Sequence, residues 1–128
     1  MISTKLTLVT PRGSYTLDVW IPQGRREQER GLQGFEAELT VNRGMLFLPE
    51  QLSDEDQDAP NKIAMWLASV RVPLAILWFR SNGTLGHVHT VQPGDTSSFV
   101  EPGVAVLEVR ADVVERLGIV PELTRASW

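Results

Sequence analysis

The sequence predicts a mainly β fold: a single domain with a sandwich or barrel-like sheet and two short helices. Six or seven short segments carry the alternating or continuous apolar pattern of strands, and turn residues separate them. A chain of 128 residues suits one domain, which buries about two-thirds of the surface that its unfolded chain exposes. The sequence shows no internal repeat or interdomain linker, so residues 1–128 are expected to form one unit.

Two local patterns give the predicted elements. Strands are expected where apolar side chains alternate with polar ones or run continuously over several residues. The predicted strands cover residues 6–9, 14–21, 44–48, 63–68, 74–80, 84–91 and 104–110. One helix is expected over residues 25–32, which are rich in helix formers and end near Gly31 or Gly34. The second is expected from Asp112, a good N-cap residue, to Gly118.

The pair Asn82-Gly83 predicts a hairpin with a two-residue turn. Both central residues of a type I′ turn need positive φ, which Asn and Gly tolerate. The register that follows places His87 opposite Trp78 and His89 opposite Ile76. Because the strand before this turn is apolar on both faces, it is expected to lie in the centre of the sheet.

Composition and charge argue against several kinds of site and partner. The chain has no cysteine, which excludes disulfides, thiolate zinc sites and cysteine nucleophiles. Its net charge of −4 argues against binding nucleic acid, which needs clustered Lys and Arg. No stretch approaches 18 apolar residues and the first residues lack a signal-peptide pattern, so no membrane contact is expected. We expect a cytoplasmic protein, or part of a virus particle assembled there.

Several short segments, taken in order, give the chain a resemblance to a known family. They are Arg30-Gly31-Leu32-Gln33, Gly44-Met45-Leu46-Phe47, Trp66, Pro73-Leu74, Asn82-Gly83, Leu107-Glu108 and Leu117-Gly118-Ile119. In this order and spacing, over about residues 15–120, the chain resembles the domain of unknown function 192 family of small β-rich proteins. The resemblance implies a fold but no settled activity.

The chain departs from the family pattern after Trp66. Where the family has Met, a basic residue and Asn, this chain has Leu67, Ala68 and Ser69. Ala75 stands where the family has the Asp of Pro-Leu-Asp. If those groups form a polar site in relatives, most of it is lost here. We therefore expect a non-catalytic interaction or structural module that self-associates or binds a protein partner in a larger assembly.

Glu108 is the first candidate site residue. Val104 and Val106 share its face of the predicted strand, so its carboxylate is expected in apolar surroundings, where it needs a partner. Arg30 is the natural candidate because its guanidinium can donate two hydrogen bonds to a carboxylate. The main hypothesis is a structural ion pair between Arg30 and Glu108, and the alternative is a catalytic carboxylate.

His87 and His89 are the candidate metal ligands. Two histidines at positions i and i+2 of a strand project side by side, as in metal-binding β-barrels of the cupin type. That pattern also needs a Glu a few residues later, which this sequence does not have. The protein is therefore expected to hold no cofactor. The alternative is a divalent transition metal or small molecule bound by the two histidines with Arg80 or Glu101.

The four tryptophans suggest where a partner could bind. Trp66 and Trp78 are expected in the core. Trp20 falls on the polar side of its predicted strand and Trp128 is the last residue, so these two are the interface candidates, since aromatic residues are enriched at interfaces. The alternative is that Trp20 covers a second apolar face and Trp128 is a loose chain end.

Overall fold

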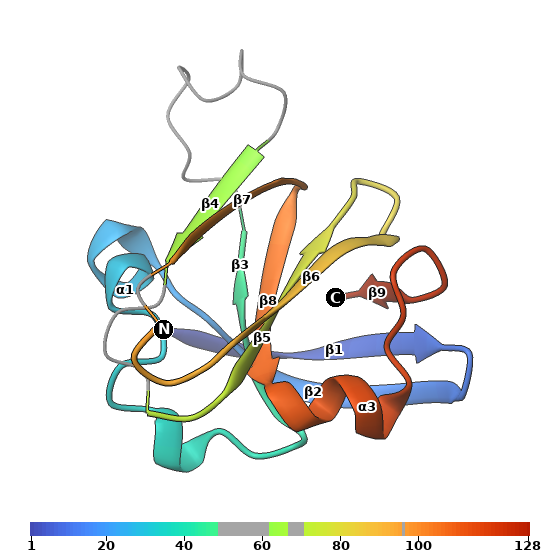
Figure 1. Ribbon diagram of the computed structural model, residues 1–128, viewed down its shortest axis with the longest axis horizontal. Coiled ribbons are helices and arrows are strands. Elements are labelled where there is room, and N and C mark those ends of the chain that lie inside the picture. The colour runs from blue at the N-terminus through green and yellow to red at the C-terminus, as the bar shows by residue number, and fades with distance from the viewer. Residues whose placement is uncertain (49–61, 67–70, 96) are drawn as a thin grey trace.

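The structure is a computed structural model that describes residues 1–48, 62–66, 71–95 and 97–128. Strands dominate these residues, and the helices are short (Figure 1). The elements are β1 (Ile2–Thr10), β2 (Gly13–Ile21), α1 (Gly24–Arg30), the 3-10 helix η1 (Glu36–Glu38), β3 (Arg43–Phe47), β4 (Lys62–Trp66), β5 (Leu74–Phe79), β6 (Leu85–Val91), β7 (Ser98–Pro102), β8 (Ala105–Arg110), α3 (Ala111–Leu117) and β9 (Arg125–Ser127).

The main sheet has seven strands in the order β6-β5-β8-β3-β2-β1-β9. Its neighbouring strands are antiparallel except for β2 and β3, which are parallel. The two ends of the sheet meet, because the amide of Ala126 donates to Gly83 over 2.9 Å and that of Leu85 donates to Thr124 over 2.8 Å. The sheet is therefore curled, and the predicted barrel-like β fold with two short helices is confirmed (Figure 1).

A first hydrophobic cluster lies inside the curl. It joins Leu85 to Ala126, which come from opposite ends of the sheet, and it includes the fully buried Val113 of α3. Side chains from β1, β2, β3, β5 and β8 complete it. Burial of this cluster explains why the sheet closes on itself, since the hydrophobic effect favours removing both sheet ends from water.

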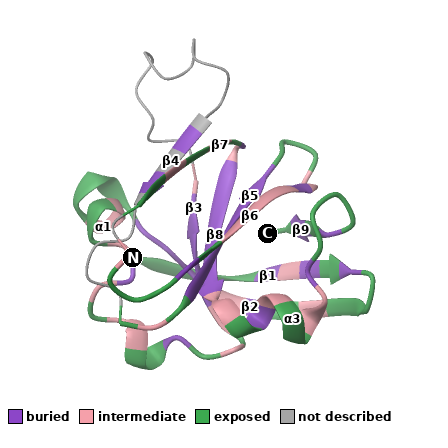
Figure 2. Ribbon diagram, in the orientation of Figure 1, coloured by how far each residue is buried: buried purple, intermediate pink, exposed green. Residues whose placement is uncertain are grey.

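A second hydrophobic cluster lies on the other side of the same sheet. It contains Met45, Ile76 and Trp78 from the sheet. A separate ribbon of β4 and β7, paired antiparallel, covers these side chains together with the segment that follows α1. All six residues of β5 are buried between the two clusters, which confirms the predicted central position of this strand (Figure 2).

The turn between β5 and β6 differs from the predicted type I′ turn. Gly83 has a φ of 86°, but Asn82 does not adopt positive φ, and the amide of Gly83 donates to the carbonyl of Arg80. The turn is thus longer by one residue than predicted. A register shift beside Trp78 compensates for it, so His87 still lies opposite Trp78 and the other predicted histidine pairing also holds.

Both helices end where the sequence predicts, at Gly31 and Gly118. Asp112 is not the N-cap of α3, because Arg110 occupies that position and its guanidinium binds the Asp112 carboxylate at 2.9 Å. The strands β7 and β9 were not predicted. Residues 67–68, the end of the predicted fourth strand, lie outside the described residues.

Gly44 provides a test of the close approach between β3 and β8. A Cβ atom at Gly44 would lie 2.8 Å from the carbonyl oxygen of Glu108 and 3.0 Å from the Leu107 side chain. Gly44→Ala is therefore expected to lower the free energy of unfolding by about 1–3 kcal/mol, measured by urea denaturation. Gly86→Ala is the matched control, because its Cβ would meet only the flexible Arg80 side chain at 3.4 Å. Equal stability of the two variants would contradict this account.

Candidate functional site

Several of the segments that carry the family resemblance contribute side chains to one side of the main sheet. Leu32 follows α1, Met45 lies on β3 and Leu74 begins β5, and all three belong to the second hydrophobic cluster. Glu108 of β8 lies in the same layer, since it pairs with both Met45 and Ile76. We call this side of the sheet, with the residues that cover it, the signature side.

A surface cavity of about 440 Å³ opens next to the signature side. Its lining includes, among the described residues, Gln33, Gly34, Glu36, Ala37 and Arg71. Phe35 and Val72, which are neighbours of these residues in the sequence, pack against the second hydrophobic cluster. The cavity has the volume of a small-molecule site, and it forms where the motif ending at Gln33 meets the segment leading to Pro73.

Four side chains form a stack from the end of α1 to β3. The Arg30 guanidinium lies 5.1 Å from the centre of the Phe35 ring, and that ring lies 5.6 Å from Trp20. The Arg43 guanidinium lies 4.3 Å from the Trp20 ring. Each cation is attracted by the ring face beneath it, so the stack fixes both guanidinium groups.

Trp20 is thus a core residue and not a surface one. Its exposed fraction is 7%, because the segment after α1 covers the side of β2 that strand alternation assigned to water. The prediction of an exposed interface residue is wrong for Trp20. The alternative prediction, in which Trp20 covers a second apolar face, agrees with the structure.

The predicted ion pair between Arg30 and Glu108 is not among the ion pairs of the described residues. Arg30 instead donates from Nε to the carbonyl oxygen of Gln33 over 3.1 Å and lies over Phe35. The Arg30 guanidinium therefore contacts Gln33 and Phe35 of the loop after α1 and not Glu108 as predicted.

Glu108 is 1% exposed, and in the part of the chain that is described its Oε2 has no hydrogen-bond partner. Burial raises the pKa of Glu108 to about 8, because the charged form cannot be solvated there. At neutral pH the group is a carboxylic acid, which can donate a hydrogen bond. The Nε of Arg43 on the neighbouring strand is also buried without a partner among these residues. The signature side thus holds two unsatisfied polar atoms.

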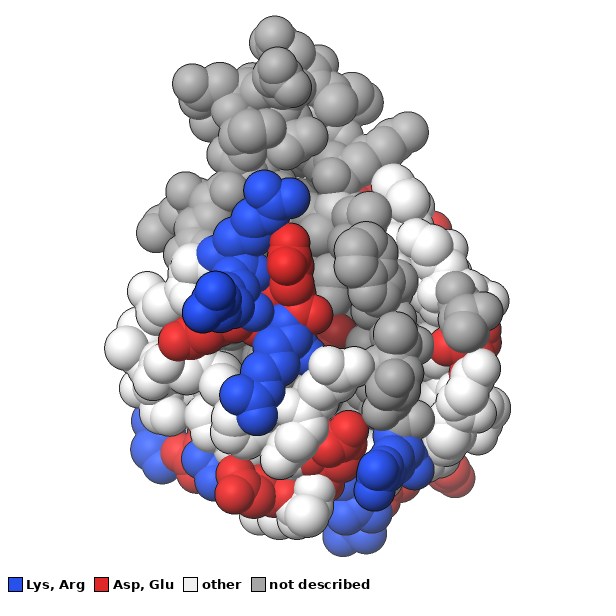
Figure 3. All heavy atoms as spheres, turned by 90° about the vertical axis from the view of Figure 1, so that its left-hand side faces the viewer, with Lys and Arg blue, Asp and Glu red and all other residues white. Residues whose placement is uncertain are grey.

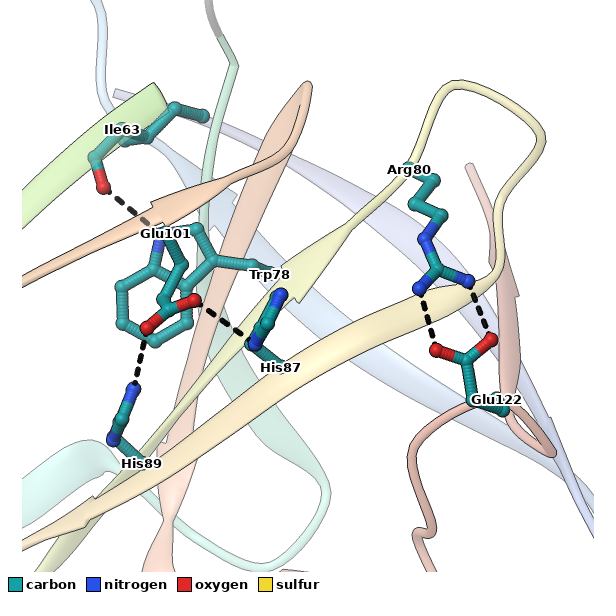
Figure 4. Close-up of polar contacts among 7 residues, drawn as sticks. All are labelled: Ile63, Trp78, Arg80, His87, His89, Glu101 and Glu122. Carbon is teal, nitrogen blue, oxygen red and sulfur yellow. Dashed lines mark hydrogen bonds and ion pairs between the residues drawn. The ribbon is translucent and has the colours of Figure 1, made fainter. Parts of the chain in front are cut away.

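Glu101 of β7 binds both histidines of β6 (Figure 4). Its Oε2 lies 2.9 Å from Nδ1 of His87, and its Oε1 lies 3.2 Å from Nε2 of His89. Each carboxylate oxygen lies close to one imidazole, and the contact with His89 is a hydrogen bond. In the described ranges no group of three or more His, Asp or Glu side chains is placed to hold a metal ion. Metal binding by His87 and His89 stays a prediction, which elemental analysis of the purified protein can test.

Aromatic contacts complete the attachment of the β4–β7 ribbon. The indole Nε1 of Trp78 donates to the carbonyl oxygen of Ile63 over 3.0 Å (Figure 4). The His89 ring stacks on Phe99 at 4.6 Å and meets the Trp78 ring edge-on at 5.4 Å. The histidine pair therefore fastens the ribbon to the sheet.

Arg80, a suggested neighbour of the histidines, is engaged elsewhere. Both of its terminal nitrogens donate to the Glu122 carboxylate, which ties the end of β5 to the C-terminal segment (Figure 4). These hydrogen bonds hold the pKa of Glu122 below its ordinary value. Trp128, at the end of that segment, is 47% exposed and meets the Phe79 ring edge-on at 6.4 Å. The side chain of Trp66 is outside the described set.

Comparison with known proteins decides the family. The profile of domain of unknown function 192 (DUF192), described as "Uncharacterized ACR", matches residues 7–124. This chain belongs to the DUF192 family. The resemblance seen in the sequence is thereby confirmed. No curated protein matches the chain.

Two crystal structures have the same fold as this DUF192 protein. One is a protein of unknown function from Novosphingobium aromaticivorans, 24% identical with a TM-score of 0.81, covering 98% of this chain and 85% of that one. The other, from Sinorhizobium meliloti, is described as a "putative transcription regulator". It is 26% identical with a TM-score of 0.82, covering 98% of this chain and 93% of that one.

None of the described helices is long and apolar enough to cross a lipid bilayer. The cytoplasmic location and the lack of a nucleic-acid partner stay predictions.

The pH dependence of stability tests the state of Glu108. In the unfolded chain Glu108 ionises near pH 4.5, whereas in the native protein it stays protonated up to about pH 8. Between these values the native state binds the extra proton, so this group lowers the free energy of unfolding by about 1.4 kcal/mol per pH unit as the pH rises. Glu108→Gln is expected to remove that slope and to be more stable than the wild type at pH 8.

The measurement is urea denaturation at several pH values between 4.5 and 8.5. Glu115→Gln, an exposed position on α3, is the control and should keep the wild-type pH profile. If Glu108→Gln also keeps that profile, Glu108 is ionised in the native state and the account of its burial is wrong.

Proposed function

We propose that this DUF192 protein is a binding module whose small polar ligand occupies the cavity between residues 33–37 and Arg71. The observation that carries the proposal is the cavity itself, which forms where the family motif ending at Gln33 meets the segment leading to Pro73. Sites of this kind are concave and combine a few polar groups with apolar walls.

The lining offers groups for binding and no nucleophile among its described residues. Arg71 supplies a guanidinium. The Glu36 carboxylate accepts a hydrogen bond from the amide of Gly34 over 2.9 Å, which holds the loop in shape. This chemistry supports recognition of a polar molecule and suits the expected non-catalytic role.

A titration followed by NMR tests the cavity. We expect at least one compound from a panel of carboxylates, phosphates, amines and neutral sugars to shift the amide signals of residues 33–37 and 71 saturably. Arg71→Ala should weaken that binding about tenfold or more, because a hydrogen bond to a charged group is lost. Arg26→Ala removes an exposed arginine of α1 that does not line the cavity and should bind as the wild type does. A full panel without local shifts would contradict the proposal.

A second function, contact with a protein partner or another copy of the chain, is favoured by the C-terminal segment. Three of its large apolar side chains are exposed: Leu123 by 64%, Trp128 by 47% and Val120 by 41%. Exposed apolar and aromatic groups that lie together mark interfaces more often than isolated ones. We therefore retain the interaction or structural role in a larger assembly as a proposal, with this segment as the contact.

Sedimentation velocity tests this contact. The wild type is expected to show a mass that rises with concentration, and the double variant Leu123→Ser, Trp128→Ala is expected to stay monomeric because it loses the apolar surface. Both positions lie outside β9, so its pairing with β1 is retained. Val100→Ser changes a side chain that is 53% exposed on β7 and is the control. A wild type that is monomeric at every attainable concentration would overturn self-association.

A further inference from the structure

Building on the proposed function, we infer that the cavity takes an oxyanion: a metabolite-sized molecule whose carboxylate or phosphate group binds Arg71 and the terminal nitrogens of Arg30. The inference follows from where the two guanidinium groups lie, from what already engages them and from the local balance of charge.

Arg30 does not line the cavity, but its guanidinium lies next to Gly34, one of the lining residues. A Cβ atom at Gly34, which does line the cavity, would lie only 2.9 Å from Nη2 of Arg30. Nη2 of Arg30 is therefore close to Gly34 at the edge of the cavity. Gly34 itself has a φ of 86°, a conformation that glycine adopts without strain, so the loop approaches the guanidinium closely.

Existing contacts fix Arg30, and the hydrogen bond that it donates among the described residues comes from Nε and not from a terminal nitrogen. Its Nε donates to the carbonyl oxygen of Gln33 over 3.1 Å, and one face of its guanidinium lies over Phe35. Within the part of the chain that the structure describes, Arg30 forms no ion pair with a carboxylate. A guanidinium that is already ordered loses less side-chain entropy on binding, and its planar fork matches carboxylate and phosphate oxygens.

Arg71 adds a second guanidinium at the same cavity. It is exposed, and the ion pairs of the described residues do not include it. Glu36 is the one acidic side chain of the described lining, and its Oε2 already accepts from the Gly34 amide. Among the described groups at and beside the cavity, two guanidinium groups outnumber one engaged carboxylate, which gives these groups a net positive charge.

That positive charge is local to the cavity and not part of a broad basic surface. On the face of the molecule where α1 lies, basic and acidic side chains are interspersed (Figure 3). The whole chain carries a net charge of −4. A small positive site on an acidic protein favours a small anion over an extended polyanion, which would meet repulsion from the surrounding carboxylates.

The test uses the full chain, labelled with ¹⁵N, at low ionic strength, with sodium phosphate, sodium acetate, sodium chloride and methylammonium chloride as probes. Phosphate, acetate or both are expected to shift the amides of residues 33–37 and 71 saturably, beyond the effect of chloride at equal ionic strength. The two anions distinguish a phosphate ligand from a carboxylate ligand.

Matched variants identify the two arginines. Arg71→Gln and Arg30→Gln should each weaken the anion about tenfold, and Arg30→Lys should weaken it less, because it keeps the charge but loses the fork. Arg26→Gln is the control and should bind as the wild type does. Thermal unfolding of each variant shows that a loss of binding does not come from a loss of fold.

The outcomes separate this inference from the proposed function. If an amine or a neutral sugar shifts these amides and the two oxyanions do not, the oxyanion inference is wrong and the binding function stands. If compounds of every charge leave these amides unchanged, both are wrong. If phosphate shifts the amides of exposed arginines over the whole surface equally, the effect is general charge attraction and the inference is also wrong.

Discussion

Burial of the main sheet on both of its sides is the constraint on which the rest of this structure depends. One hydrophobic cluster fills the curl, the other lies under the β4–β7 ribbon and the segment after α1, and β5 is buried between them. A polar group on such a sheet is kept from water whichever side it faces. This explains why Glu108, at the middle of the sheet, remains protonated at neutral pH, while carboxylates at the rim, such as Glu122, are ionised and paired.

The same burial determines how the covering pieces are attached. The β4–β7 ribbon packs on a face of the main sheet and does not extend its edge, so side-chain contacts hold the ribbon in place. The indole of Trp78 reaches a ribbon carbonyl, and Glu101 joins the two histidines. The segment after α1 is held by the stack that runs from Arg30 to Arg43. The cavity follows from this second attachment, since it lies between that segment and the chain leading into β5.

Much of the sheet could be predicted from the sequence because strand patterns are local. The pairing of the histidines with β5 was predicted even though the turn was not, since the extra turn residue and the register shift beside Trp78 cancel. The second covering layer could not be predicted. Alternation along β2 assumes that one side meets water, so Trp20 was placed outside. The partners of Arg30 and of the histidines come from that layer, and its strand β7 is short, half-exposed and ends at Pro102.

The position of Ala75 changes how the departures from the family pattern are interpreted. Ala75 is fully buried in the cluster inside the curl, opposite Val109, whereas Glu108 faces the other cluster. An aspartate at this position would therefore not share a side of the sheet with Glu108 or with the cavity. Alanine at this position therefore removes no polar group from the signature side, where Arg43 and Glu108 lie with Arg71 and Glu36 beside them at the cavity. The loss of hydrophilic residues inferred from the sequence therefore concerns other positions, and charged groups are present on and beside the signature side.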